Sequence, residues 1–188
     1  MTVGRDPLTV SVGAGSLFVA PLSTAEPVSL SISFPSTWVN MGYTEKGTSF
    51  TRGVTAADVD VAEEYYTPAV VITAYKTTVD FALSQLTAAA LTICFNGGTT
   101  TVNTGDVTFD PPAAGQEVYI MIGWDSNLRD ERYIWRKCIQ VGATATSRQK
   151  VLPQALLPVS FECVKPAGLQ PFRWWGNAGA ATPVRTGA

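Results

Sequence analysis

Apolar and polar residues alternate along much of this chain, and alternation with a period of two is typical of half-buried β-strands. The clearest case is segment 69–83. From Tyr75 onward its odd positions are mostly apolar, whereas its even positions carry small or charged side chains. We therefore expect one face of this strand to pack on a core. Similar patterns predict further strands at 8–12, 17–19, 29–34, 117–124, 133–141, 159–163 and 172–175.

The period changes after residue 83. Ser84 can cap a helix, Leu86 and Ala90 recur at helical spacing, and Asn96-Gly97-Gly98 supplies a left-handed stop. The sequence therefore predicts one helix at about 84–95. In the strand predicted after the polar turn 125–131, four apolar residues are expected to share one face, and these are Tyr133, Trp135, Ile139 and Val141.

Three segments look irregular, namely 37–48, 97–116 and the residues from 176 onward. We expect a single β domain over 1–176 with a long loop at about 37–68, followed by a flexible C-terminal tail at 177–188. The predicted fold class is mainly β, a β-sandwich or open barrel with one flanking α-helix.

The composition narrows the range of functions. Charged residues make up only 15% of the 188 residues, and 13 basic and 15 acidic residues give a formal net charge of −2. A protein that grips nucleic acid through its phosphates needs a basic surface, so this class is disfavoured. A chain so poor in charge still has to stay soluble, and one way is to bury surface against copies of itself.

The sequence also lacks the groups for most catalytic and metal chemistry. It contains no histidine, which removes Ser-His-Asp and Cys-His nucleophile systems and histidine metal ligands. No Gly-rich phosphate-binding motif is present, and Glu63 and Glu64 would point to opposite faces of a strand. We therefore expect no enzymatic activity, no metal and no cofactor.

The cysteines and the hydropathy bear on the cellular compartment. Cys94, Cys138 and Cys163 form no C-x-x-C motif and lie in apolar runs, which predicts reduced thiols in the core and synthesis in a reducing compartment. No segment reaches the roughly 18 uninterrupted apolar residues of a membrane helix, and no export signal is visible at the N-terminus. We expect no membrane association.

Charge is unevenly distributed along the chain. Four acidic residues lie close together, namely Asp58, Asp60, Glu63 and Glu64. Six basic residues follow much later, namely Arg129, Arg132, Arg136, Lys137, Arg148 and Lys150. Three arrangements are open. The acidic and basic segments pair within the fold, they meet across a subunit interface and set its register, or they are plain solvated faces.

Several segments, in this order and spacing, resemble phage tail tube proteins. The run Trp38-Val-Asn-Met-Gly-Tyr-Thr-Glu-Lys-Gly is similar to the family pattern W-x-x-[LM]-G-Y-T-x-x-G. Thr78-Val-Asp-Phe-Ala-Leu-Ser-Gln-Leu-Thr87 resembles T-V-x-F-x-L-x-E-L-T, with Gln85 in place of the usual acid. Leu156-Leu-Pro-Val-Ser-Phe-Glu-Cys163 is similar to the late strand I-P-V-x-F-x-A. The resemblance covers roughly residues 10 to 175.

The resemblance implies a structural role in the virion. Tail tube proteins have a β-sandwich or barrel with a flanking helix, related to the tube proteins of type VI secretion. Six copies close into a homo-hexameric ring, each giving four strands to a barrel around a channel, and the rings stack into a tube that DNA crosses. Such a protein is assembled in the host cytoplasm and contacts the tape measure, terminator, and baseplate or tip proteins. DNA passes without specific binding.

Two groups of residues are candidates for such a site. The expected subunit-interface residues are Trp38, Tyr43, Asp58, Asp60, Glu63, Glu64, Arg132 and Arg136. The expected lumen residues are Lys76, Thr78 and Asp80, because neutral or acidic walls do not hold phosphates. Two alternatives stay open. One is a Trp- and Tyr-bearing β-sandwich that binds carbohydrate, and the other is a tail terminator or capsid decoration protein. Trp174 and Trp175 suggest a sugar platform, but neighbours on a strand diverge, so packing is the favoured role of this pair.

Overall fold

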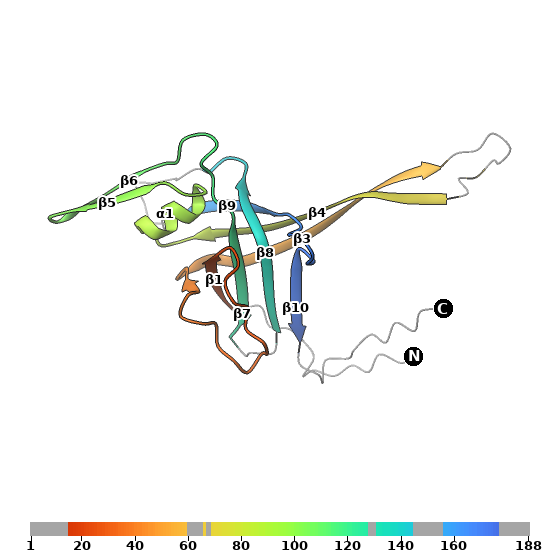
Figure 1. Ribbon diagram of the computed structural model, residues 1–188, viewed down its shortest axis with the longest axis horizontal. Coiled ribbons are helices and arrows are strands. Elements are labelled where there is room, and N and C mark those ends of the chain that lie inside the picture. The colour runs from red at the N-terminus through yellow and green to blue at the C-terminus, as the bar shows by residue number, and fades with distance from the viewer. Residues whose placement is uncertain (1–14, 60–65, 67–68, 128–130, 145–155, 177–188) are drawn as a thin grey trace.

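The computed structural model describes residues 15–59, 66, 69–127, 131–144 and 156–176. These residues form ten strands and one helix (Figure 1). In chain order the elements are β1 (Gly15–Pro21), β2 (Val39–Asn40), β3 (Thr44–Val59), β4 (Ala69–Leu83), α1 (Ala88–Cys94), β5 (Thr99–Asn103), β6 (Asp106–Asp110), β7 (Ile120–Ser126), β8 (Glu131–Val141), β9 (Leu157–Cys163) and β10 (Phe172–Gly176).

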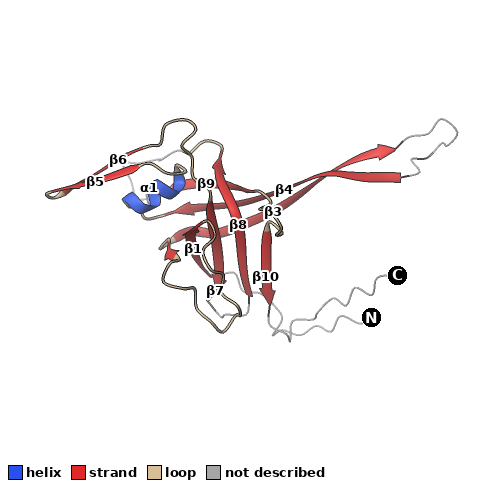
Figure 2. Cartoon of the chain, viewed as in Figure 1, coloured by secondary structure: helices blue, strands red, loops and turns tan. Residues whose placement is uncertain are grey.

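Eight of the strands form one antiparallel sheet. Its order is β2-β1-β7-β8-β9-β4-β3, and β10 pairs with β8 beside this path. β5 and β6 form a separate hairpin next to α1 (Figure 2). The sheet curves, so that Phe50 of β3 packs against Phe172 of β10 with ring centroids 5.1 Å apart. The predicted mainly β fold with one helix is confirmed.

The main hydrophobic core is built by five strands and the helix. Its buried side chains come from β1, β4, β7, β8, β9 and α1, with Met41 added from the loop after β2. In β4 the odd residues Thr77, Val79, Phe81 and Leu83 are buried, and the even residues between them are only half-buried. The predicted core-facing side of this strand is confirmed from Thr77 onward, whereas Tyr75, where it was expected to begin, is exposed. All three cysteines lie in this core as free thiols, as expected.

The helix is shorter than expected. α1 begins after Thr87, whose side chain accepts a hydrogen bond from the backbone N–H of Ala90. The predicted cap at Ser84 is wrong. The backbone N–H of Ser84 donates to the carbonyl of Tyr43 and so continues the pairing of β4 with β3 by one residue. The predicted stop is correct, since Asn96, Gly97 and Gly98 all have positive φ.

The strand expected at 29–34 is not formed, although all of its residues are described. Phe34 instead stacks on Phe18 with ring centroids 4.4 Å apart. The carbonyls of Ser29 and Ile32 accept hydrogen bonds from the side chain of Arg132, each at 2.8 Å. An arginine side chain therefore takes the place of a neighbouring strand as the partner of this backbone.

The predicted common face of β8 is wrong in its second half. Ile122 of β7 pairs with Trp135, whereas Ile120 pairs with Cys138, so β8 carries one extra residue here. This β-bulge reverses the facing of the strand. Trp135 and Cys138 both point into the main core, and Ile139 and Val141 are only half-buried.

Two segments that were expected to be irregular contain strands. β3 occupies most of the described part of the loop predicted at about 37–68, and β5 and β6 lie within 97–116. Their residues are largely exposed on both faces, so apolar and polar positions do not alternate there. The predicted strand at 8–12 and the tail at 177–188 lie outside the described residues.

Candidate assembly surfaces

The outer halves of β3 and β4 leave the rest of the molecule as a two-stranded arm (Figure 1). We call β3 residues 51–59 and β4 residues 69–76 the arm, and every one of these residues is exposed. Val70 is 62% exposed and its neighbour Val71 is 51% exposed. Adjacent strand residues point to opposite faces, so both faces of the arm present apolar side chains.

The base of the arm is fixed to the body through aromatic contacts. The guanidinium of Arg52 lies 4.5 Å from the ring centroid of Tyr75 and 5.9 Å from that of Phe172 on β10. Beyond this point only the β3–β4 ladder holds the two strands in the described part of the chain. A two-stranded hairpin alone is marginally stable in water. The arm therefore has the composition and the geometry of an element that packs against something else.

The exposed interface candidates lie at the two ends of β3. Tyr43, just before β3, is 75% exposed. Asp58 lies in the outer half of β3 opposite Val70 and is also exposed. Asp60, Glu63 and Glu64 lie outside the described residues. Tyr43 and Asp58 thus have the exposed surface that a contact with another chain requires.

Trp38 lies in the interior of the chain. It is 5% exposed and belongs to a second, smaller core with Ala20, Met121 and Ile134. Its Nε1–H donates a hydrogen bond to the carbonyl of Ala25 at 2.9 Å. The expectation that Trp38 anchors a subunit interface is therefore corrected, since its side chain is used within the fold.

Arg132 is buried in an intrachain ion pair. Its side chain is 1% exposed, and its Nε and Nη2 donate to the two carboxylate oxygens of Asp125 at 3.2 and 2.7 Å. Its Nη1 donates to the carbonyls of Ser29 and Ile32. A bidentate pair of this kind fixes orientation as well as charge. Arg132 therefore lacks free surface for the interface role expected of it.

Arg136 is also buried in an intrachain ion pair. Its guanidinium pairs with both carboxylate oxygens of Glu26, and its Nη1 donates to the carbonyl of Gln170 at 3.0 Å. The second oxygen of Glu26 also lies 3.3 Å from Arg173. Arg132 and Arg136 thus pair within the fold with Asp125 and Glu26. Most of the acidic segment 58–64 lies outside the described residues, so the pairing expected of it stays a prediction.

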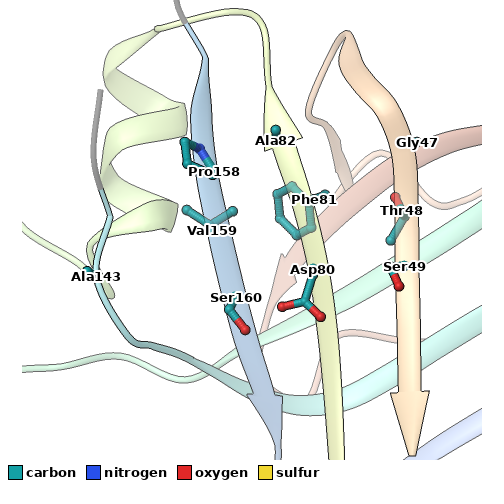
Figure 3. A pocket seen from close by; sticks show the side chains of 10 residues that line it. All are labelled: Gly47, Thr48, Ser49, Asp80, Phe81, Ala82, Ala143, Pro158, Val159 and Ser160. Carbon is teal, nitrogen blue, oxygen red and sulfur yellow. The ribbon is translucent and has the colours of Figure 1, made fainter. Parts of the chain in front are cut away.

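The outward face of β4 continues across its neighbours as a polar surface. Lys76 Nζ lies 3.2 Å from Glu162 Oε2 on β9. Asp80 lies between Ser49 on β3 and Ser160 on β9, with which it pairs in register (Figure 3). This part of the face is a shallow, open depression (Figure 3). We call the outward side chains of residues 76–82 of β4, and of the β3 and β9 residues paired with them, the polar face, and it carries the three lumen candidates Lys76, Thr78 and Asp80.

Trp174 and Trp175 do not form a common platform. Trp175 packs on the second core, whereas Trp174 is half exposed and its Nε1–H donates to Glu131 at 2.9 Å. Their side chains diverge, as expected for neighbours on a strand.

The sequence interpretation missed one exposed apolar element. Val102 and Val107 face each other across the β5–β6 hairpin and are both exposed. The signal for this hairpin was the two-residue turn Thr104-Gly105, where Gly105 has a φ of 91°.

Comparison with known sequences identifies the family of this chain. Within the described residues no helix is long and apolar enough to cross a membrane. No curated protein sequence matches the chain significantly. The sequence profile of the phage tail tube protein family matches residues 4–185, which is nearly the whole chain. The chain therefore belongs to the phage tail tube protein family, and it is a structural component of the virion tail.

Proposed function

We propose that six copies of this protein close into a ring, that the rings stack into the tail tube, and that DNA passes through the channel without specific binding. The observation that carries this proposal is the arm. Its apolar residues on both faces have no cover within the described part of the chain. Exposed apolar surface of this kind marks a site of association.

The edge of the sheet supports association between copies. β3 is the last strand of the sheet path and is 16 residues long. A long edge strand presents backbone N–H and C=O groups that readily pair with another chain. If β3 joins the sheet of a neighbouring copy, a ring closes and the edges disappear. A closed barrel of many strands leaves an open channel, because its diameter grows with strand number.

The polar face is the proposed wall of the channel. Glu162 offsets the charge of Lys76, and Asp80 leaves the face slightly acidic. Small neutral residues such as Ser49, Thr78 and Ser160 make up much of the remainder. A surface of this composition repels phosphates rather than retaining them. DNA would therefore slide along it without adhering.

The assembly is tested with the purified full chain by sedimentation velocity and negative-stain electron microscopy. We expect rings or tubes about the width of a phage tail. A chain that stays monomeric at high protein concentration would refute the proposal. A persistent single ring would instead favour a tail terminator, and binding to glycans by a monomer would favour a carbohydrate-binding module.

The role of the arm is tested with the double variant Val70→Lys, Val71→Lys. Burying two lysines at a contact is unfavourable, so we expect the protein concentration needed for assembly to rise by about tenfold or more. The matched control is Val28→Lys, Val118→Lys, which changes two exposed valines outside the arm. Circular dichroism checks that both variants fold. Equal loss of assembly in both variants would contradict a specific role for the arm.

The proposed setting is a virion tail assembled in the host cytoplasm. The tape measure protein would occupy the channel during assembly, and the terminator and the baseplate or tip proteins would cap the two ends. These contacts would be made by the exposed ends of a ring, and cross-linking of assembled tails followed by mass spectrometry would identify the residues involved.

A further inference from the structure

Two of the buried thiols face each other directly across the β8–β9 ladder. Cys138 and Cys163 are partners in register, and their Sγ atoms lie 3.2 Å apart. The backbone N–H of Val164 donates to the carbonyl of Lys137, one residue outside the pair on each strand. This pattern marks a non-hydrogen-bonded pair, in which Cα atoms of antiparallel strands are about 4.5 Å apart. That spacing falls within the range that a disulfide spans, about 4.4–6.8 Å.

The pair also lies at the junction between the two halves of the sheet. The β8–β9 ladder comprises four residue pairs and ends at Cys138 and Cys163. Within the described residues, this short ladder joins the half of the sheet made by β2, β1, β7 and β8 to the half made by β9, β4 and β3. The second half includes the arm and the polar face. A covalent bond here would fasten the two halves of the protein together.

We propose that Cys138 and Cys163 are a modification site that forms an intrachain disulfide when the protein passes from reducing to oxidising surroundings. With a small disulfide such as oxidised glutathione as the oxidant, each cysteine loses a proton and one electron. One S–S bond forms in the protein, the S–S bond of glutathione breaks, and two glutathione thiols are released. No atom of the protein other than the two sulfurs changes its bonding.

The order of the exchange follows from burial. Cys163 is the last residue of β9 and is slightly exposed, whereas Cys138 is fully buried. We therefore assign the first step to Cys163, which forms a mixed disulfide with glutathione. Cys138 then attacks the Cys163 sulfur and displaces glutathione. Burial, together with the neighbouring Cys163 thiol, raises the pKa of Cys138 well above its usual value, so the second step is slow and requires local opening of the strands.

Cys94 serves as an internal reference. It is fully buried in α1, and burial raises the pKa of its thiol to about 12. A raised pKa slows the reaction of Cys94 as it slows that of Cys138, so the two thiols differ in their sulfur partners rather than in their acidity. The described structure gives its sulfur no thiol partner. The proposal thus predicts one specific bond among three cysteines rather than general oxidation.

The biological setting rests on the proposed function. Thiols stay reduced in a bacterial cytoplasm, and disulfides persist outside cells. A tail subunit makes this transition when the host lyses. The disulfide would then stiffen the tube only after assembly is complete. The chemistry itself depends on the geometry of the two thiols, so it can be tested on the unassembled chain, and its failure would leave the proposed assembly untouched.

The test incubates the full chain with oxidised glutathione or diamide and then blocks the remaining thiols in denaturant with an alkylating reagent. We expect an intact mass 2 Da lower than that of the reduced chain before alkylation, and one thiol left for the reagent. Trypsin should yield peptides 138–148 and 151–173 joined by a disulfide. The closed loop spans 25 residues, and we expect the Tm to rise by about 5–10 °C.

Variants separate the specific pair from other oxidation. Cys94→Ala should keep both the linked peptides and the rise in Tm, and Cys138→Ala and Cys163→Ala should lose both. If an alanine variant does not fold, peptide mapping of the wild type still decides the matter. Three alkylatable thiols after prolonged oxidation would overturn the proposal. Linkage through Cys94, or disulfides only between chains, would overturn it as well.

Discussion

The two halves of β4 differ sharply although they belong to one continuous strand. Residues 77–83 alternate between buried and half-buried side chains and contribute to the main core. Residues 69–76 are exposed throughout and belong to the arm. The inner half finds partners on β9 as well as on β3, whereas the outer half pairs with β3 alone. One chain thus covers the apolar side chains of the body. It leaves those of the arm exposed and supplies only the backbone pairing between the two strands of the arm.

The difference shows how one strand can stabilise the fold with its inner half and offer a surface for association with its outer half. Apolar residues of the body are covered by other parts of the same chain, so their substitution should change the free energy of unfolding. Apolar residues of the arm stay in water in the monomer, so their substitution should leave that free energy nearly unchanged and affect association instead. Substitutions in matched pairs can separate these two effects.

The largest effect is expected for Arg132→Ala in the body. This change leaves Asp125 without its bidentate partner and the carbonyls of Ser29 and Ile32 without their donor. Breaking a buried ion pair by removing one partner costs about 3–5 kcal/mol. Urea denaturation followed by circular dichroism measures the change. The control Arg173→Ala removes a half-exposed arginine and should cost less than about 1 kcal/mol. Similar losses in the two variants would contradict this prediction.

The next effect compares two positions on β4 itself. Phe81 is buried and stacks on Phe161 with ring centroids 5.7 Å apart, so Phe81→Ala should destabilise the protein by about 3–4 kcal/mol. Val71→Ala in the arm should change the free energy of unfolding of the monomer by less than about 0.5 kcal/mol. Both values come from urea denaturation at low protein concentration. A large loss for Val71→Ala would show that the arm is part of the cooperative core of the monomer.

A smaller effect compares two threonine hydrogen bonds. The Thr87 side chain caps α1, and Thr87→Ala should cost about 1 kcal/mol because an N–H at the helix start loses its acceptor. Thr73 in the arm donates from Oγ1 to the carbonyl of Thr55 at 3.2 Å in full contact with water. Water can replace that bond, so Thr73→Ala should cost less than about 0.3 kcal/mol. Thermal unfolding in parallel should rank the two variants, and the reverse order would be inconsistent with an independent arm.

The sequence predicted the body better than the arm for the same physical reason. The inner half of β4 and the strands β7 and β9 have one buried face, so their apolar residues alternate. β3, β5 and β6 have no buried face over most of their length and leave no such pattern. The bulge in β8 was also invisible, because it depends on pairing with β7 rather than on local sequence.

The candidate site was predicted unevenly as well. The polar side chains of Thr78 and Asp80 could be placed opposite a core face from alternation alone. The burial of Arg132 and Arg136 could not, because their partners include the carbonyl of Ser29 and the carboxylate of Glu26, each more than 100 residues away. The burial of Trp38 depends on the nearby irregular segment that contains Ala25 and Phe34. Neither distant partners nor partners in an irregular segment leave a periodic signal.

Another small effect is expected at the boundary between arm and body, where Lys76 pairs with Glu162. Both side chains are partly exposed, so Lys76→Ala should cost less than about 0.5 kcal/mol in the monomer. At about 1 M salt the Debye length falls to roughly 3 Å, and the remaining difference should vanish. Urea denaturation at low and high salt, with Glu162→Gln and the double variant completing a cycle, measures the coupling. A coupling above about 1 kcal/mol that persists in salt would place the boundary farther out, and the body would then extend into the first residues of the arm.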